Sequence, residues 1–434
     1  MSANELLVRR AFVMTMDPAL GDLPDADVHV RDGAIAAVGR DLRAPDAEII
    51  DGREMIALPG LVDTHWHVWT TLLRSMAGDR PEHGYFPTSR GIGVFYTPTD
   101  VYRATRLAAA EAIDSGITHI HDWCHNVRSP AHAEASLAAL AESGIRARFG
   151  YGWPTAKQGS GLIDLDDLER LARGWPDYSA GGRLTLGLAW PGPAAGKVEA
   201  AAERELRKAR ELGLPASVHA NASQAAAGGI AALARSGLLA PDLQIIHAIW
   251  TTEEEVEALA ASGAAVSVSP FTELRIGFGI PTTLKLLAAG VKLGLSVDTP
   301  ALSGNADPFA IMKAVQNLAN GQAGDERALP ARRVLALGTL EGARSIGMDH
   351  AIGSLTPGKR ADMILLDTRR PNLAVLTDAA HLVVEAVHPG NVDTVIVDGR
   401  VLKRAGRLTT LDVETIVAEA RESNRALRER AGWW

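Results

Sequence analysis

The middle of the chain, about residues 56–350, alternates short apolar runs with longer segments rich in Ala, Leu and Glu. Short apolar runs are typical of buried strands, and the longer segments are typical of helices, for example at 200–212 and 252–262. The pattern predicts strands at 60–67, 118–123, 147–152, 184–190, 215–220, 244–248, 265–269 and 292–298. Eight strands, most of them followed by a helix, indicate an α/β fold and fit a (β/α)8 TIM-type barrel better than a doubly wound sheet.

The two ends of the chain are rich in strand-like patterns instead. Asp32-Gly33 separates two such runs near the N-terminus, and Asp398-Gly399 does the same near the C-terminus, and Asp-Gly is a hairpin signal. We therefore predict one small β-sandwich domain built from residues 1–55 and 355–411. The barrel would occupy residues 56–354, and a helical tail would occupy 412–434.

Polar side chains stand at the ends of four predicted barrel strands. These residues are His65 and His67 on the first strand, His219 on the fifth, His247 on the sixth and Asp298 on the eighth. A strand sends alternate side chains to the same face, so His65 and His67 point together, with Asp63 below them. Barrel enzymes carry their chemistry at the carboxyl ends of the strands, and imidazole and carboxylate groups bind divalent ions. The alternative is that each is a core polar residue with ordinary hydrogen bonds, but five at matching strand ends favour a metal site.

The segment Ala57-Leu-Pro-Gly-Leu-Val-Asp-Thr-His-Trp-His67 resembles the first barrel strand of the amidohydrolase superfamily. The later motifs are spaced as in its cytosine deaminase and chlorohydrolase branch, and the likeness covers nearly the whole chain. The resemblance implies a β-domain built from both termini. It also implies that one metal ion is held by His65, His67, His219 and Asp298.

The resemblance further implies that His247 orients the attacking water or polarises the substrate, and that Asp298 also relays a proton. The predicted strand at 184–190 contains no lysine, so a second metal bridged by a carbamylated lysine is not expected. Zn²⁺ is the expected ion, and Fe²⁺ is the alternative.

One departure from the family pattern concerns proton transfer. Deaminases of this branch carry a glutamate three positions after the fifth-strand histidine, and this chain has Ala222 there. Glu273, after the seventh strand, is our first candidate to replace it, and Asp122 is the second. The alternative for Glu273 is a solvated carboxylate paired with Arg275. A substrate whose leaving group needs no acid would remove the need for a replacement.

Three further residues are candidates to contact the substrate. Asp122 and His125 lie at the end of the second strand, where His119 is expected to be a core or second-layer histidine. Asn221 either hydrogen-bonds the substrate or caps the turn that follows it. The segment 70–99 contains several aromatic residues, and in the family this region overhangs the site.

These features predict a metal-dependent hydrolase that attacks a C–N bond, by deamination or amide hydrolysis, in a small cyclic nitrogen compound through metal-activated water. The alternatives are displacement of chloride or another good leaving group, and a non-hydrolytic use of the metal in a lyase or isomerase. A non-catalytic scaffold would need none of the five strand-end residues.

Composition limits the classes of molecule that the protein is expected to bind. The 434-residue chain has a formal net charge of −8 and no basic run, which argues against binding to nucleic acid or to a membrane surface. Its single cysteine, Cys124, excludes an intrachain disulfide. We expect a cytoplasmic homo-oligomer that acts on a small molecule.

Overall fold

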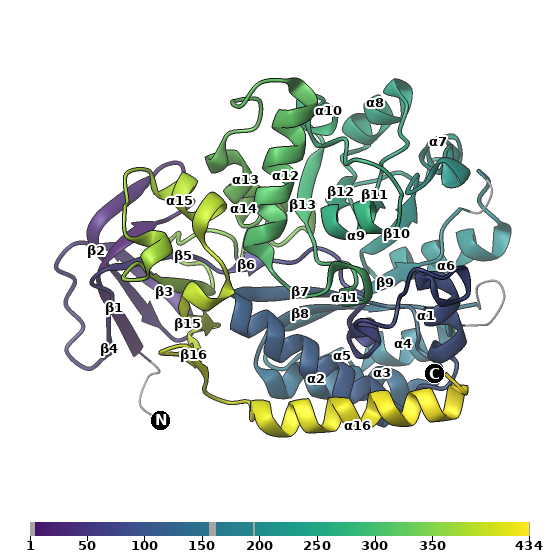
Figure 1. Cartoon of the computed structure of the whole chain (residues 1–434), viewed down its shortest axis with the longest axis horizontal. Coiled ribbons are helices and arrows are strands. Elements are labelled where there is room, and N and C mark those ends of the chain that lie inside the picture. Colours follow the sequence, from purple (N-terminus) through teal and green to yellow (C-terminus); the bar gives the residue numbers. More distant parts are fainter. Residues whose placement is uncertain (1–4, 156–161, 194–195, 434) are drawn as a thin grey trace.

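The computed structural model describes residues 5–155, 162–193 and 196–433, and these form a parallel barrel beside a second sheet (Figure 1). The barrel sheet has eight strands in sequence order: β6 (Leu61–Val62), β7 (Ile117–Cys124), β8 (Arg146–Tyr151), β9 (Leu184–Trp190), β10 (Ala216–Ala220), β11 (Leu243–His247), β12 (Ala265–Val268) and β13 (Lys292–Leu295). All neighbouring strands pair in parallel. The predicted barrel is confirmed, although its first and last strands are shorter than the apolar runs.

Helices cover the outside of the barrel, because parallel strands need long crossovers and a sheet that is buried on both faces. Their bounds are α2 (Pro98–Ser115), α3 (Pro130–Ser143), α4 (Leu165–Arg173), α5 (Trp175–Tyr178), α6 (Ala200–Glu211), α7 (Gly229–Arg235), α8 (Glu253–Ser262), α9 (Pro270–Arg275), α10 (Thr283–Ala288), α11 (Pro300–Ser303), α12 (Pro308–Ala323), α13 (Ala331–Leu337) and α14 (Leu340–Ser345). Thr252 caps α8 in a capping box with Glu255.

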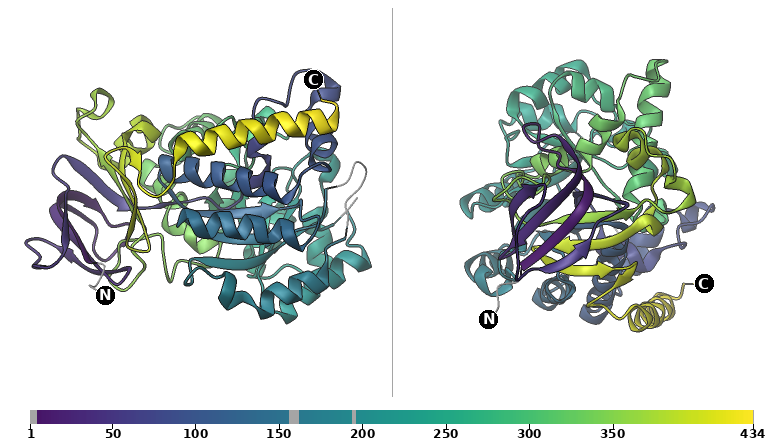
Figure 2. Two further views of the ribbon diagram at one scale, coloured as in Figure 1. Left: turned by 90° about the horizontal axis from the view of Figure 1, so that it is seen from below. Right: turned by 90° about the vertical axis from the view of Figure 1, so that its left-hand side faces the viewer.

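The second sheet joins both ends of the chain, as predicted. Its nine strands are β1 (Glu5–Met14), β2 (Asp22–Arg31), β3 (Ala34–Gly39), β4 (Glu48–Asp51), β5 (Met55–Pro59), β14 (Met363–Asp367), β15 (Val392–Val397), β16 (Arg400–Arg404) and β17 (Arg407–Leu408). The N-terminal and C-terminal strands meet where β5 pairs antiparallel with β14, with Ala57 opposite Leu365 (Figure 2). One continuous hydrogen-bonded sheet therefore runs through both halves.

The remaining helices lie in the last part of the chain and in the β6–β7 connection. They are α1 (Tyr85–Gly93), α15 (Ala379–Ala386) and α16 (Val413–Ala431), and short 3-10 turns occur at η1 (Val68–Leu73), η2 (Pro81–His83), η3 (Gln224–Ala226), η4 (Pro371–Leu373) and η5 (Pro389–Asn391). Helix α16 runs along α2, where Arg106 pairs with Glu419 at 2.6 Å (Figure 2). The Trp433 ring at its end lies 5.4 Å from the His83 ring, so the tail also supports the β6–β7 connection. No helix in the described ranges is long and apolar enough to span a membrane.

The barrel closes between the extensions of β6 and β13 rather than between their short ladders. Thr64 N donates to Leu295 O at 3.1 Å, Asp298 N donates to His65 O at 2.9 Å, and His67 N donates to Asp298 O at 2.7 Å. These hydrogen bonds bring the first and last strands together at the carboxyl edge. The strand-end residues of both therefore meet.

Gly60, the residue between β5 and β6, tests how tightly the chain packs against β7 where it enters the barrel. A Cβ atom at this position would lie 2.1 Å from Oγ1 of the buried Thr118. Gly60→Ala should therefore destabilise the protein by about 1–3 kcal/mol, as overpacked core substitutions do. Urea denaturation measures this as a lower midpoint.

Gly321 in α12 provides the matched control, because a Cβ atom there meets no heavy atom within 4 Å. Gly321→Ala should raise the free energy of unfolding by about 0.5–1 kcal/mol, because alanine has a higher helix propensity than glycine. Equal midpoints for the Gly60→Ala variant and the parent would contradict the close packing.

Candidate metal centre and substrate pocket

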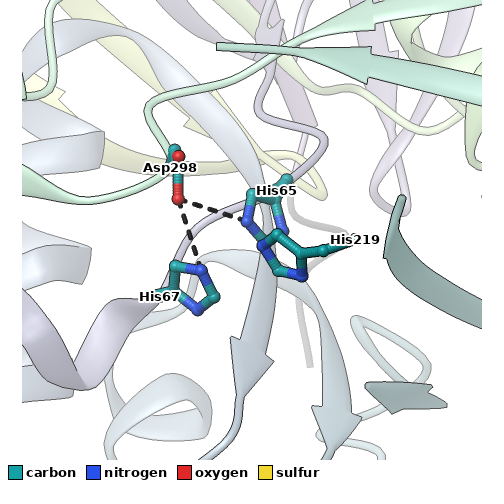
Figure 3. A group of neighbouring side chains, drawn as sticks. All are labelled: His65, His67, His219 and Asp298. Atoms are coloured by element: carbon teal, nitrogen blue, oxygen red, sulfur yellow. Dashed lines mark ion pairs between the residues drawn. The ribbon is translucent and has the colours of Figure 1, made fainter. Parts of the chain in front are cut away.

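Four potential metal ligands meet at the carboxyl edge of the barrel. His65 and His67 follow β6, His219 lies on β10 and Asp298 follows β13, and one ligand atom from each lies within 4.8 Å of the others (Figure 3). Nε2 of His65 and Nε2 of His67 are each 3.3 Å from Oδ1 of Asp298. The His219 ring completes the group, with its centroid 4.8 Å from that of His65. The four residues that the resemblance implies as ligands therefore come together.

The electrostatics of this group suit a metal ion. Burial lowers the pKa of His65, His67 and His219, so their imidazoles are neutral and offer lone pairs. Both ring nitrogens of His65 are buried and make no hydrogen bond within the described residues. Nδ1 of His67 lies 3.3 Å from the carbonyl of Trp123, which places the proton on Nδ1 and leaves the Nε2 lone pair free. The residues present therefore fit a divalent ion.

The backbone near the ligands is held in an uncommon conformation. Asp298 and His247 have φ angles of 62° and 79°, in the left-handed region that residues other than glycine seldom adopt. Asp63 stabilises this edge: its buried carboxylate accepts hydrogen bonds from His65 N at 3.2 Å and from Val297 N at 2.7 Å. One side chain thus connects the extensions of the first and last strands beneath the ligands.

His247 and Glu273 form a buried pair beside the ligands. Oε1 of Glu273 lies 3.0 Å from Nδ1 of His247 and also accepts a hydrogen bond from Ser269 N at 2.9 Å. Nε2 of His247 faces Oδ2 of Asp298 at 3.9 Å. Burial disfavours charge on His247, but the hydrogen bond to Glu273 and the charge of Asp298 outweigh burial and raise the pKa of His247.

The placement of Glu273 overturns one of the two sequence interpretations of this residue. It is fully buried, so it is not a solvated carboxylate, and Arg275 pairs with Asp79 at 3.5 Å instead. Glu273 also does not line the pocket; it contacts the site only through His247. The reason is that helix α9 begins directly after β12, and its first turn folds Glu273 inward behind β11.

A cavity of about 530 Å³ opens above the ligands. Its aromatic wall comes from Tyr85 and Phe86 of α1, Trp123, Trp153 and Phe278. Tyr85 and Phe86 confirm the expectation that part of segment 70–99 overhangs the site. Tyr96 does not contribute, since its hydroxyl donates to the carbonyl of Trp69 in the core. Ala222 lines the cavity, at the position where the family resemblance implies a glutamate.

His125 and Asp122, which were also predicted to contact the substrate, point to opposite faces because side chains alternate along a strand. His125 lines the cavity, and its Nδ1 accepts a long hydrogen bond from Nε1 of Trp69 at 3.4 Å. Asp122 does not line the cavity, contrary to our expectation: it points to the opposite face of β7 and accepts a hydrogen bond from Ser136 of α3 at 2.8 Å. Burial raises the pKa of Asp122 to about 7. His119 is a buried core histidine, as expected.

Asn221 supports the scaffold and does not line the cavity. Its side chain donates to Oε2 of Glu255 at 2.8 Å and accepts from Ile230 N at 3.0 Å, which holds α7 and α8 together. Asn221 therefore has a structural role and is not placed to hydrogen-bond a substrate in the cavity. Sequence analysis missed Trp123 and Trp153 as wall residues. Because side chains alternate along a strand, Trp123 could have been predicted to share the face of His121. No local sequence pattern distinguishes Trp153.

A parallel eight-stranded barrel with three histidines and one aspartate at its carboxyl edge defines a class of metal-dependent barrel hydrolases. The sequence matches the amidohydrolase family over residues 56–402, and the chain belongs to that family. It is a hydrolase of carbon–nitrogen bonds other than peptide bonds, with a candidate metal site.

Several known proteins are similar to the chain over most of its length. It is 30% identical over 449 residues to a 5′-deoxyadenosine deaminase of Methanosarcina acetivorans, covering 98% of this chain and 99% of that protein. It is 32% identical over 394 residues to a 5-methylthioadenosine/S-adenosylhomocysteine deaminase of Moorella thermoacetica, covering 86% and 87%.

Two solved structures share the fold. An adenosine deaminase from Xanthomonas campestris with bound zinc has a TM-score of 0.85 and 26% identity, covering 98% of each chain. Atrazine chlorohydrolase from Arthrobacter aurescens, complexed with zinc, has a TM-score of 0.82 and 22% identity, covering 96% of this chain and all of that one (100%). The second likeness supports the fold alone.

The ligand assignment predicts the metal content of variants. Replacing both His65 and His67 with alanine removes two ligands, so elemental analysis after metal loading should find no bound ion. His125→Ala is the matched control, because the His125 ring lies 4.4 Å from the His67 ring yet belongs to no ligand group. That control should retain about one equivalent, the expected stoichiometry of a mononuclear site. A double variant that keeps its metal would refute the assignment.

Proposed function

We propose that the protein removes an amino group by hydrolysis from a small aromatic nitrogen heterocycle. It would use one zinc ion, held by His65, His67, His219 and Asp298. The observation that carries this proposal is the group of four ligands at the floor of an aromatic-walled cavity. Zinc in the similar adenosine deaminase structure supports the choice of metal over iron. The cytoplasmic location and the homo-oligomeric state stay predictions of the sequence.

A divalent ion at these four ligands supplies a Lewis acid that lowers the pKa of a coordinated water toward about 7. The protein's own residues then have two tasks. They hold a flat substrate against the ion, and they move protons between the attacking water and the leaving nitrogen.

We assign the proton transfer to His247, positioned by Glu273. Because Glu273 accepts from Nδ1, the neutral imidazole keeps its lone pair on Nε2, on the side of Asp298 and the cavity. Nε2 of His247 can thus take a proton, and the buried carboxylate of Glu273 stabilises the resulting imidazolium. This pair would replace the glutamate that is absent at Ala222. Glu273 would act as a positioning residue rather than as the proton carrier.

The cavity wall suits a flat, uncharged or anionic ring. Trp123, Trp153 and Phe278 offer ring faces and edges to a planar substrate. Among the described residues that line the cavity, Asp298 carries the one carboxylate, and it is committed to the metal site. A cationic substrate would therefore find no counter-charge. The named deaminase relatives, such as the 5′-deoxyadenosine deaminase, support an amino-substituted heterocycle.

Ala222 favours a second candidate, displacement of chloride or a similar leaving group from the same kind of ring. Such a group departs without being protonated, so it does not need the missing glutamate. The two candidates differ in what the zinc-loaded enzyme releases.

The test is a screen of 5′-deoxyadenosine, adenosine, aminotriazines and chlorotriazines with zinc-loaded enzyme. Ammonia release that disappears when His65 and His67 are both alanine supports the proposal. Chloride release without ammonia supports the second candidate. Release of neither product from any of these rings would contradict both.

Glu273→Gln should lower kcat by about 10²–10⁴-fold, the contribution of a well-placed acid–base group. The amide of glutamine can donate to Nδ1 of His247 and so stabilise the wrong tautomer. KM and metal content should change little, because Glu273 touches neither the cavity nor a ligand. Steady-state kinetics together with elemental analysis separate these effects.

Glu255→Gln is the matched control, since Glu255 is another buried glutamate that hydrogen-bonds a side chain, that of Asn221, away from the ligands. It should keep near-normal kcat. Adding Ala222→Glu to the Glu273→Gln variant returns a carboxylate to the family position and should recover at least part of the lost turnover. Near-normal kcat in Glu273→Gln alone would contradict the role of the pair.

A further inference from the structure

A second cavity, of about 470 Å³, lies at the opposite end of the barrel from the metal ligands. It opens where the amino ends of β8 and β9 face the second sheet. The residues that line it include the first residue of β8, Arg146, together with Arg148, Thr185, His350, Arg360 and Asp398. Three arginines therefore line this cavity.

Most of the positively charged side chains here pair with two aspartates. Arg146 forms a bidentate pair with Asp362, at 2.6 and 3.0 Å, and also contacts Asp398 at 3.1 Å. Arg360 pairs with Asp398 as well, and Arg183 approaches the same carboxylate at 4.0 Å. Asp398 is thus shared by three guanidinium groups.

Arg148 has no carboxylate partner among the described residues. Its Nη2 donates to the carbonyl of Ile346 at 2.6 Å, and its buried Nε makes no hydrogen bond within the described chain. Burial alone lowers the pKa of Arg148 to about 10, with no nearby acid to oppose it. A buried charge without a counter-charge is costly, so this guanidinium is suited to an anion from outside.

We propose that this cavity is a binding site for a phosphate-type oxyanion. Three guanidinium groups, of Arg146, Arg148 and Arg360, line the cavity, and two carboxylates, of Asp362 and Asp398, pair with Arg146 and Arg360, which leaves the charge of Arg148 unbalanced. Phosphate is an anion at neutral pH, and the planar guanidinium fork pairs well with its oxygens. The ligand is either inorganic phosphate or the phosphate group of a small monoester.

The experiment is calorimetric titration of the zinc-loaded parent protein with inorganic phosphate and, separately, with glycerol phosphate, at constant ionic strength adjusted with chloride. We expect saturable binding of phosphate at one site. Tighter binding of glycerol phosphate would identify a monoester as the preferred source. A parent protein that binds neither probe overturns the proposal.

Arg148→Met should weaken phosphate binding at least tenfold. Arg207→Met is the matched control, because Arg207 is an exposed arginine paired with Glu203, and it should bind as the parent does. His350→Glu adds a carboxylate at the exposed rim of the cavity and disturbs no core packing, so it tests the site even if Arg148→Met does not fold. It should also weaken binding several-fold.

Phosphate could instead bind at the metal centre, and one variant separates the two locations. The variant with both His65 and His67 replaced by alanine should bind phosphate as tightly as the parent if the anion occupies the arginine cavity. Loss of binding in that variant overturns the proposal. Unchanged binding in Arg148→Met and His350→Glu overturns it as well.

Discussion

The closure of the barrel between β6 and β13 is the constraint on which the rest of the site depends. Two of the ligands follow the first barrel strand and one follows the last, just over 230 residues later in the sequence. The hydrogen bonds between His65, His67 and Asp298 main-chain groups, at 2.7 and 2.9 Å, hold the two ends in register. Asp63 adds a side-chain bridge to Val297 at 2.7 Å. Without this closure the ligands of the first and last strands would not meet.

Burial gives the ligands their chemistry. It keeps three imidazoles neutral, so they can bind a cation, and it leaves one carboxylate to balance part of the ion's charge. The same burial explains why His247 needs Glu273. In a dry environment an imidazolium is stable only beside a fixed negative charge, and Glu273 provides one at 3.0 Å.

The sequence predicts the barrel strands and the ligands well because both depend on local pattern. Apolar runs mark the strands, and a histidine or aspartate at the end of such a run marks the carboxyl edge. It fails where the answer depends on packing between distant elements. Asp122 could have been excluded by alternation along β7, but Glu273 faces His247 only because α9 turns inward. Trp153 joins the wall from a loop that carries no signal of its own.

X-ray absorption spectroscopy of the zinc-loaded protein reports the atoms bound to the ion and so tests the ligands directly. Three histidines and one aspartate should give a shell of nitrogen and oxygen at about 2.0–2.1 Å, with the scattering of three imidazole rings. Replacing His219 with alanine should reduce that scattering by one ring. A shell that contains sulfur at about 2.3 Å, or one without imidazole scattering, would rule out this set of ligands.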